Sequence, residues 1–142
     1  MSAPLITEAQ LRERFLSVPF ARFLNIDLDL RGDELTIVMP YRDDLIGNVM
    51  LPALHGGTLG ALLELVAVAE VTLKQGHAQL PKTIDITIDY LRSGRPVATY
   101  ARAKVTRLGR RIASVHAEAW QHERSDPIAA LNGHFLLSQA DS

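Results

Sequence analysis

The sequence predicts an α+β domain in which a curved, mainly antiparallel sheet wraps around one long central helix. The helix is indicated by residues 58–74, where apolar side chains recur three and four positions apart. Segments on both sides of it alternate apolar and polar residues, which is typical of half-buried strands. Turns join these segments as hairpins, so neighbouring strands are expected to run antiparallel.

Ahead of the long helix we expect one short helix and two strands. Residues 7–16 are predicted to be helical, with Thr7 as the N-cap. Residues 24–30 and 34–39 are predicted to be strands joined by a glycine-containing turn. Residues 41–53 are polar and punctuated by Gly and Pro, so they are expected to form the longest loop.

Four strands are predicted after the long helix. Gly76 is expected to end that helix, because glycine readily adopts the left-handed conformation common at helix C-termini. The predicted strands, separated by turn-forming residues, cover residues 84–90, 98–106, 112–121 and 128–138.

Small residues recur along the later strands, at Ala101, Ala103, Ala113, Ala117 and Ala119. Because small side chains permit close approach, such a face can curve around the apolar helix. This arrangement is the hotdog fold. We expect one domain over residues 1–142, with residues 1–18 as an N-terminal helical segment.

Composition limits the function classes. The chain has 142 residues, 47% of them hydrophobic, and a net charge of −1, so no overall field favours nucleic acid or an acidic membrane. It has no cysteine, which excludes disulfides, thiolate metal sites and a cysteine nucleophile. We see no signal peptide, and the apolar stretch of residues 58–69 is short for a bilayer. We therefore expect a cytoplasmic protein.

Several catalytic signatures are missing from the sequence. It contains no Gly-x-Ser-x-Gly elbow, P-loop or dinucleotide-binding fingerprint, and its histidines lack zinc-type spacing. We therefore expect neither a metal nor an organic cofactor.

Two glycines open the long helix in the run Leu54-His55-Gly56-Gly57. The first backbone N–H groups of a helix are free for a ligand, and the helix dipole favours an oxygen that gains negative charge. The carbonyl oxygen of a thioester under attack is such an oxygen. Glu64 is the only charged residue in the apolar first part of the helix, where burial would favour a role as base or nucleophile.

Simpler explanations exist for both residues. His55 fits a histidine that only starts a helix, and Glu64 fits a solvated helical stripe. Glu70 and Lys74 illustrate the second case, because their spacing predicts an exposed ion pair.

The combination of motifs resembles the PaaI-like hotdog acyl-CoA thioesterases of the 4-hydroxybenzoyl-CoA thioesterase-like superfamily. The resemblance extends over residues 19–137. Its motifs are Asn48, the run at residues 54–57, Glu64, the strand at residues 82–92 and the Gly-Arg hairpin at residues 107–113.

The resemblance implies a role for each matching residue. Gly56 matches the glycine whose N–H polarises the thioester carbonyl, and Glu64 the acid that attacks the thioester or activates water. Asn48 matches a polar residue that holds the carbonyl or the water, His55 the motif histidine that orients its neighbours, and Thr83 a hydroxyl that positions water. Asn48 and Glu64 would come from opposite subunits, which implies at least a homodimer and commonly a dimer of dimers.

Basic residues concentrate in residues 91–117, which carry seven of them and no acidic residue. Exposed arginines on a hairpin would account for this, but arginine also binds the phosphates of coenzyme A well. Nucleic acid is not expected, because no nucleic-acid motif accompanies the stretch. The candidate substrate- and CoA-binding residues are Gly57, Arg92, Gly109, Arg110 and Arg111.

The predicted function is hydrolysis of an acyl-CoA thioester to the free acid and CoA. Two alternatives remain open at this point. One is a hydratase or dehydratase of the same fold, pairing His55 with Glu64. The other is a non-catalytic acyl-CoA-binding protein. The acyl group stays open between aryl and short, medium or long alkyl.

Overall fold

The computed structural model describes residues 6–138. Its helices are α1 (Glu8–Leu16), α2 (Pro19–Phe23), the short 3-10 helix η1 (Asp43–Leu45) and α3 (Gly56–Gln75). Its strands are β1 (Asp27–Arg31), β2 (Glu34–Met39), β3 (Ile46–Asn48), β4 (Ala53–Leu54), β5 (Lys82–Tyr90), β6 (Thr99–Leu108), β7 (Ile112–Trp120) and β8 (Ala129–Leu136).

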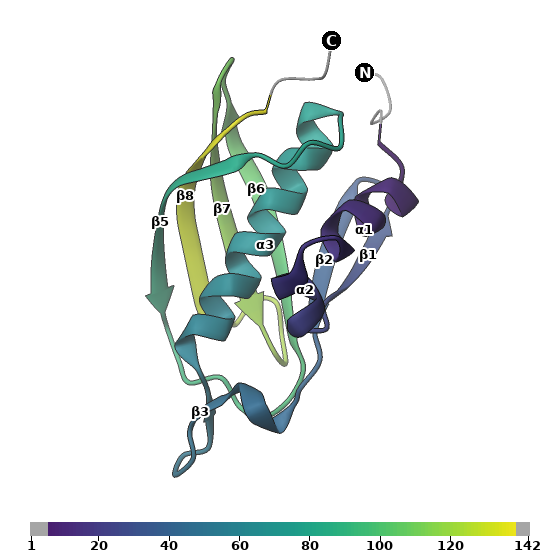
Figure 1. The fold of residues 1–142 in the computed structure, drawn as a ribbon. Coiled ribbons are helices and arrows are strands. Elements are labelled where there is room, and N and C mark those ends of the chain that lie inside the picture. Colours follow the sequence, from purple (N-terminus) through teal and green to yellow (C-terminus); the bar gives the residue numbers. More distant parts are fainter. Residues whose placement is uncertain (1–5, 139–142) are drawn as a thin grey trace.

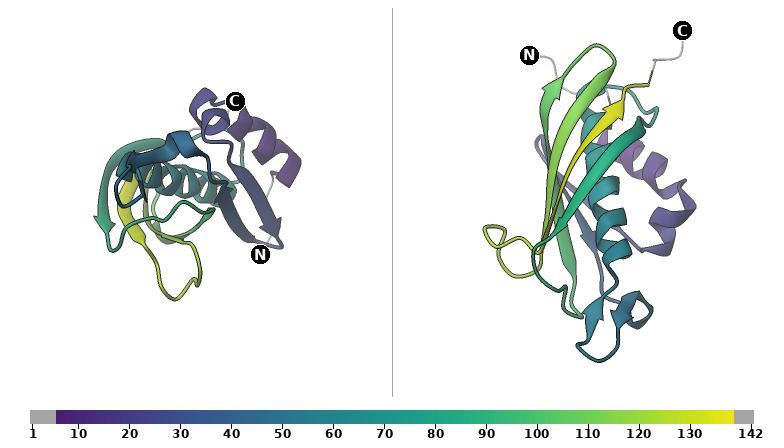
Figure 2. Two further views of the ribbon diagram at one scale, coloured as in Figure 1. Left: turned by 90° about the horizontal axis from the view of Figure 1, so that it is seen from below. Right: turned by 90° about the vertical axis from the view of Figure 1, so that its left-hand side faces the viewer.

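Six strands form one antiparallel sheet in the order β1-β2-β6-β7-β8-β5, and β3 pairs with β4 in a separate hairpin. The large sheet curves around α3, while α1 and α2 lie beside the β1–β2 end (Figures 1 and 2). The predicted fold class, a curved antiparallel sheet around one long helix, is confirmed. The order leaves β5 at one edge of the sheet.

The central helix begins two residues earlier than predicted and ends one residue later. Gly76 caps it with a left-handed φ of 81°, as predicted. By length and a mean hydropathy of 1.5, α3 is also long and apolar enough to cross a membrane. However, 67% of the most apolar 18-residue stretch of α3 is buried inside the protein. A helix that is apolar nearly all round is expected in a core.

The alanine-rich face packs where the sequence predicts. Ala101, Ala113, Ala117 and Ala119 have no exposed surface, and Ala103 is half-buried against the core. Because these side chains are small, β6 and β7 approach α3 closely and the sheet can bend around it.

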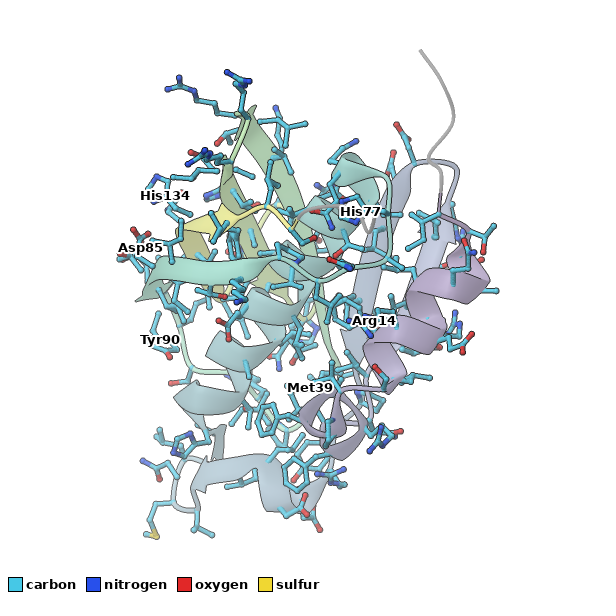
Figure 3. The ribbon with its side chains drawn as sticks, turned by 45° about the horizontal axis from the view of Figure 1, so that its top comes forward. Arg14, Met39, His77, Asp85, Tyr90 and His134 are labelled. Atoms are coloured by element: carbon cyan, nitrogen blue, oxygen red, sulfur yellow. The ribbon has the colours of Figure 1, made fainter. Side chains whose placement is uncertain are left out.

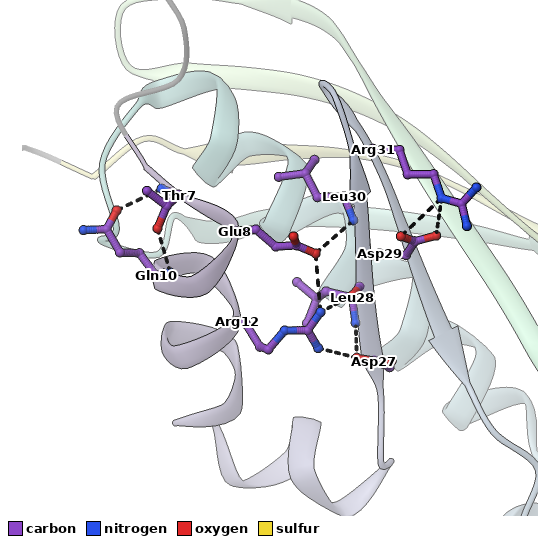
Figure 4. Close-up of polar contacts among 9 residues, drawn as sticks. All are labelled: Thr7, Glu8, Gln10, Arg12, Asp27, Leu28, Asp29, Leu30 and Arg31. Carbon is purple, nitrogen blue, oxygen red and sulfur yellow. Dashed lines mark hydrogen bonds and ion pairs between the residues drawn. The ribbon is translucent and has the colours of Figure 1, made fainter.

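The N-terminal segment contains one helix that was predicted and one that was not. Thr7 caps α1 in a capping box with Gln10. Arg12 ties α1 to β1 through Asp27 and the carbonyl of Leu28 (Figure 4). Residues 19–23 form α2, so β1 starts at Asp27, three residues later than expected. One helical turn is too short to give a period in the sequence.

The segment predicted as the longest loop is instead largely ordered. Residues 41–53 include η1, β3 and the first residue of β4, with Ile46 paired to Leu54 and Asn48 to Ala53. Strands of two and three residues carry no readable alternation, which explains the error.

The expected exposed pair of Glu70 and Lys74 is also wrong in one respect. The carboxylate of Glu70 lies 3.7 Å from the Lys74 ammonium, but Glu70 is only 6% exposed. Burial raises the pKa of Glu70, and Lys74 opposes that rise. The helix is enclosed on more sides than a surface helix, so spacing alone does not predict exposure here.

Candidate active site

The start of α3 offers one free backbone donor. His55 is the N-cap, and its Nδ1 accepts the N–H of Gly57 at 2.8 Å. The N–H of Thr58 donates to the His55 carbonyl at 3.0 Å. Gly56 is the first helical residue, so its N–H has no acceptor within the helix, and no other acceptor is found among residues 6–138. The donor best placed for a ligand is therefore Gly56 N–H.

Neighbouring segments hold this helix start in place. The N–H of His55 donates to the Leu45 carbonyl at 2.8 Å, and the N–H of Leu54 donates to the Gly94 carbonyl at 2.9 Å. The hydroxyl of Tyr90, at the end of β5, donates to the Gly56 carbonyl at 2.9 Å. Three separate parts of the chain thus fix the orientation of the first turn.

A cavity of about 340 Å³ opens beside the helix start, lined by Ala53, Leu54, Gly56, Leu59, Tyr90, Arg92, Ser93 and Gly94. Arg92 forms an ion pair with Asp126. Gly56, predicted to be catalytic, and Arg92, predicted to bind the substrate or CoA, therefore share one end of the molecule.

Glu64 and Thr83 meet further along α3. The Thr83 hydroxyl donates to Glu64 Oε2 at 2.7 Å, and the Glu64 side chain is half-buried. A β-bulge at Ile84 makes this contact possible: Thr83 pairs with Phe135, but Asp85 pairs with His134. Strict alternation from Ile86 would turn Thr83 toward the outer face, whereas the bulge returns it to the helix.

Gly56 and Glu64 do not meet within one chain. Eight residues separate them, which is about 12 Å along a helix. Gly56 is bonded to Tyr90 at one end of β5, and Glu64 to Thr83 at the other. The two groups that would act on one carbonyl are thus held at opposite ends of the edge strand.

Asn48 lies in the β3–β4 hairpin, away from Glu64. Its Oδ1 accepts the N–H groups of Met50 and Leu51 at 3.0 and 3.2 Å, so it caps the hairpin turn. Val49 and Met50 at the tip are 82% and 92% exposed, and the hairpin projects beyond the helix start (Figure 1). The side-chain amide N–H groups of Asn48 have no hydrogen-bond acceptor among residues 6–138.

The basic hairpin forms a second cavity, of about 850 Å³, lined by Arg107, Gly109, Arg110, Arg111, Ile112, Ser114 and His134. Five other arginines pair with carboxylates: Arg12, Arg31, Arg42, Arg92 and Arg102. The three in this cavity have no carboxylate partner among residues 6–138. Within the part of the chain that the structure describes, they form a positive site without a carboxylate ion pair.

This cavity lies at the Thr83 end of β5. His134 contacts Asp85, with 2.8 Å between Nδ1 and Oδ1, and both side chains lie on the same side of the sheet (Figure 3). Arg110 and Arg111 are therefore near the Glu64 end, whereas Arg92 is near the Gly56 end. The predicted CoA-binding residues divide between two places in the chain.

No group of three or more His, Cys, Asp or Glu residues that could hold a metal ion is found among residues 6–138.

A family model described as the thioesterase superfamily matches residues 51–128, more than half of the chain. The chain belongs to the thioesterase superfamily. The match includes the helix start, Glu64, Thr83 and the basic hairpin. The predicted family and the predicted enzyme class, a thioester hydrolase, are confirmed.

Relatives of this thioesterase-superfamily chain match it along most of its length. It is 28% identical to the Escherichia coli (strain K12) medium/long-chain acyl-CoA thioesterase YigI, covering 87% of this chain and 92% of the relative. A solved Chromobacterium violaceum protein is 31% identical, with a TM-score of 0.73 and coverage of 94% and 97%. A Bacillus halodurans protein solved with CoA has a TM-score of 0.77 at 18% identity, covering 94% and 91%, and shares the fold.

The sequence of this superfamily member did not point to Tyr90, Ser114 or His134. Ser114 and His134 become neighbours because β7, β8 and β5 pair in register, with Ser114 opposite His134 and His134 opposite Asp85. Strands distant in sequence give no local signal of that pairing. Tyr90 ends the strand predicted over residues 84–90, but its bond to Gly56 depends on how α3 packs against β5.

Proposed function

We propose that the protein hydrolyses acyl-CoA thioesters at a site shared by two copies of the chain. The observation that carries this proposal is the separation of a free Gly56 N–H and the Glu64–Thr83 pair at opposite ends of edge strand β5. Superfamily membership and the name of the E. coli relative support the chemistry. The Bacillus halodurans protein supports CoA as a ligand of this fold.

The edge of β5 provides the means to bring the two ends together. An edge strand presents unpaired backbone groups that can pair with another chain. Antiparallel pairing of β5 with its own copy sets the Thr83 end of one subunit against the Tyr90 end of the other. Glu64 then lies beside Gly56 of the partner subunit, and each dimer has two equivalent sites.

At such a site Gly56 N–H and the α3 dipole would hold the thioester carbonyl oxygen as negative charge develops on it. Glu64 would take a proton from water while the water oxygen adds to the carbonyl carbon. Thr83 occupies Oε2 of Glu64 and leaves Oε1 for that proton. As the adduct collapses and the C–S bond breaks, Glu64 gives its proton to the departing CoA sulfur, and the acid and CoA leave. In the alternative form of this mechanism, Glu64 itself attacks the carbonyl carbon and CoA leaves. Water then hydrolyses the anhydride that links Glu64 to the acyl group.

The other predicted residues have supporting roles in the proposal. His55 holds Gly57 through Nδ1 and so orients the helix start. Asn48 would reach the site from the hairpin with its free amide. The unpaired Arg110 and Arg111, on the Gly109 turn, suit the CoA phosphates. Arg92 would bind the substrate or CoA at the Gly56 end of β5.

The remaining expectations belong to the same proposal. A thioester is already activated, so no metal or organic cofactor is expected. We expect a cytoplasmic enzyme that binds neither nucleic acid nor membrane, assembled as a homodimer and further as a homotetramer.

A thiol-release assay tests the proposed function. Saturated acyl-CoAs of short, medium and long chain, and aryl-CoAs, are incubated with the purified protein, and free thiol is followed with a chromogenic disulfide. We expect release above background for at least one chain class. Addition of water to an enoyl-CoA without thiol release would assign a hydratase instead, and tight binding without either reaction would assign a binding protein.

A further inference from the structure

We propose that Tyr90 is a positioning residue that sets the direction of the Gly56 N–H. This inference rests on the proposed function, because it concerns how the thioester carbonyl is held. Tyr90 does not react in it; it acts through the backbone of the first helical turn.

The peptide unit between Gly56 and Gly57 is held at both ends. Its carbonyl oxygen, on Gly56, accepts the Tyr90 hydroxyl at 2.9 Å. Its N–H, on Gly57, donates to His55 Nδ1 at 2.8 Å. Two side chains from different elements thus fix one peptide plane, and the preceding N–H, that of Gly56, is the one left free.

Fixing this peptide plane matters because it can rotate about the backbone bonds of Gly56. Glycine has more backbone freedom than any other residue, so a helix that opens with two glycines does not by itself hold its first N–H groups in one direction. Catalysis by backbone donors depends on donors that are oriented before the substrate arrives. The peptide unit that carries the Gly56 N–H is held on one side by Thr58, whose N–H and hydroxyl both donate to the His55 carbonyl. Tyr90 and the His55 side chain hold the next peptide unit, and so restrict rotation about the Gly56 backbone from the other side.

Close packing of α3 on β5 allows the tyrosine to reach the helix. A Cβ on Gly56 would lie 3.2 Å from the Tyr90 ring, and one on Gly60 would lie 2.8 Å from Ile88 Cδ1. Gly56 and Gly60 are four residues apart and share a helix face. The absence of side chains on that face lets the first turns of α3 approach β5.

Tyr90 is also exposed toward the place where a partner subunit would pair. It is 54% exposed, lines the cavity beside Gly56 and lies near the free edge of the sheet (Figure 3). In the proposed dimer Tyr90 would therefore lie at the carbonyl-binding end of the shared site.

Tyr90→Phe tests the inference, because it keeps the ring and removes only the hydroxyl. We expect kcat to fall about tenfold while KM stays within about twofold, since misdirection affects the transition state more than substrate binding. Tyr100→Phe is the matched control: Tyr100 stacks on Trp120 on the outer face, and we expect unchanged kcat. Melting temperature and oligomeric mass should not change in either variant.

A spectroscopic measurement separates positioning from a general loss of structure. In a Glu64→Gln background, an acyl-CoA labelled with ¹³C at its carbonyl should show a lowered C=O stretching frequency on binding. Adding Tyr90→Phe should reduce that lowering. Unchanged kcat and unchanged stretching frequency would overturn the role of Tyr90 and leave thioester hydrolysis intact. Absence of turnover in the unsubstituted protein would overturn both.

Discussion

The two ends of β5 differ in the kind of group that they contribute. At the Tyr90 end the candidate groups are backbone N–H and C=O of the first helical turn. At the Thr83 end they are side chains, a carboxylate and a hydroxyl, with unpaired arginines nearby. A backbone donor is set by the packing of whole segments, whereas a side-chain group depends on one residue. The two ends should therefore respond differently to substitution, and only together should they hydrolyse a thioester.

The largest effect is expected at the side-chain end. Glu64→Gln keeps the shape and the hydrogen bond from Thr83 but removes the base, so kcat should fall by about 10³-fold, within the range for loss of a general base. Thiol release from the best acyl-CoA measures this. Glu70→Gln, on the same helix, is the control and should retain activity. If the Glu64 variant were as active as the wild type, Glu64 would have no role in the mechanism.

At the backbone end, Gly56→Pro should lower kcat by about 10²-fold. Proline lacks the N–H that would bind the carbonyl, yet it is favoured at the first position of a helix, and His55 already has the extended ψ of 130° suited to a following proline. Gly56→Ala is the control, because it adds the same crowding against Tyr90 but keeps the N–H. If the two variants lose activity equally, crowding rather than the donor explains the loss.

Mixing two inactive variants tests whether the ends meet across subunits. Glu64→Gln and Gly56→Pro are unfolded together and refolded at equal amounts. Half of the dimers should contain one copy of each, and one of their two sites should be intact, so about a quarter of the wild-type activity should return. A site within one chain would give no recovery, and a monomeric active protein would contradict the shared site directly.

A smaller effect is expected at the basic cavity. Arg110→Gln with Arg111→Gln removes two charges that have no carboxylate partner, so KM for acyl-CoA should rise about tenfold with little change in kcat. An acyl-pantetheine, which lacks the nucleotide, should show no such change. Arg31→Gln, in an exposed ion pair with Asp29, is the matched control. An unchanged KM in the double variant would mean that CoA does not bind at Arg110 and Arg111.

The sequence was sufficient to predict the local structure around the candidate site residues where that structure depends on local pattern. Gly56 and Glu64 lie on one strongly periodic helix, and the histidine before the glycines is its N-cap, as expected at a helix start. The family resemblance predicts a site hydroxyl at Thr83. The bulge at Ile84 that turns Thr83 toward Glu64, however, has no local signature in the sequence. Tyr90 and His134 acquire their contacts only through α3–β5 packing and through the register of distant strands.

The hairpin that carries Asn48 marks the same limit. Its polar, glycine- and proline-containing sequence predicted a loop, because such residues rarely form long strands. The carbonyl and N–H groups of Leu45 and His55 bond across the base of the hairpin and order it. Side-chain patterns in one sequence do not reveal backbone bonds of this kind, nor the subunit whose site Asn48 would join.

The smallest effect is expected at Glu70, the other glutamate of α3, and it is an effect on stability. Glu70 is more deeply buried than Glu64. Burial raises the pKa of Glu70 above its value in the unfolded chain, although Lys74 lowers it in part. A raised folded pKa gives stability that is present below the unfolded pKa, about 4.3, and is lost as pH rises through the folded pKa. Glu70→Gln keeps a neutral side chain at all pH values.

The glutamine variant should therefore gain stability over the wild type as pH rises from 4 to 8, by an amount of about 1 kcal/mol. Thermal melting of both proteins across that range measures it. Lys74→Gln should steepen the wild-type pH dependence, because it removes the cation that opposes the rise in the Glu70 pKa. A pH-independent difference would mean that Glu70 is solvated in solution. The expected result would instead show that burial of Glu70 limits the stability of the protein above the folded pKa of that carboxyl.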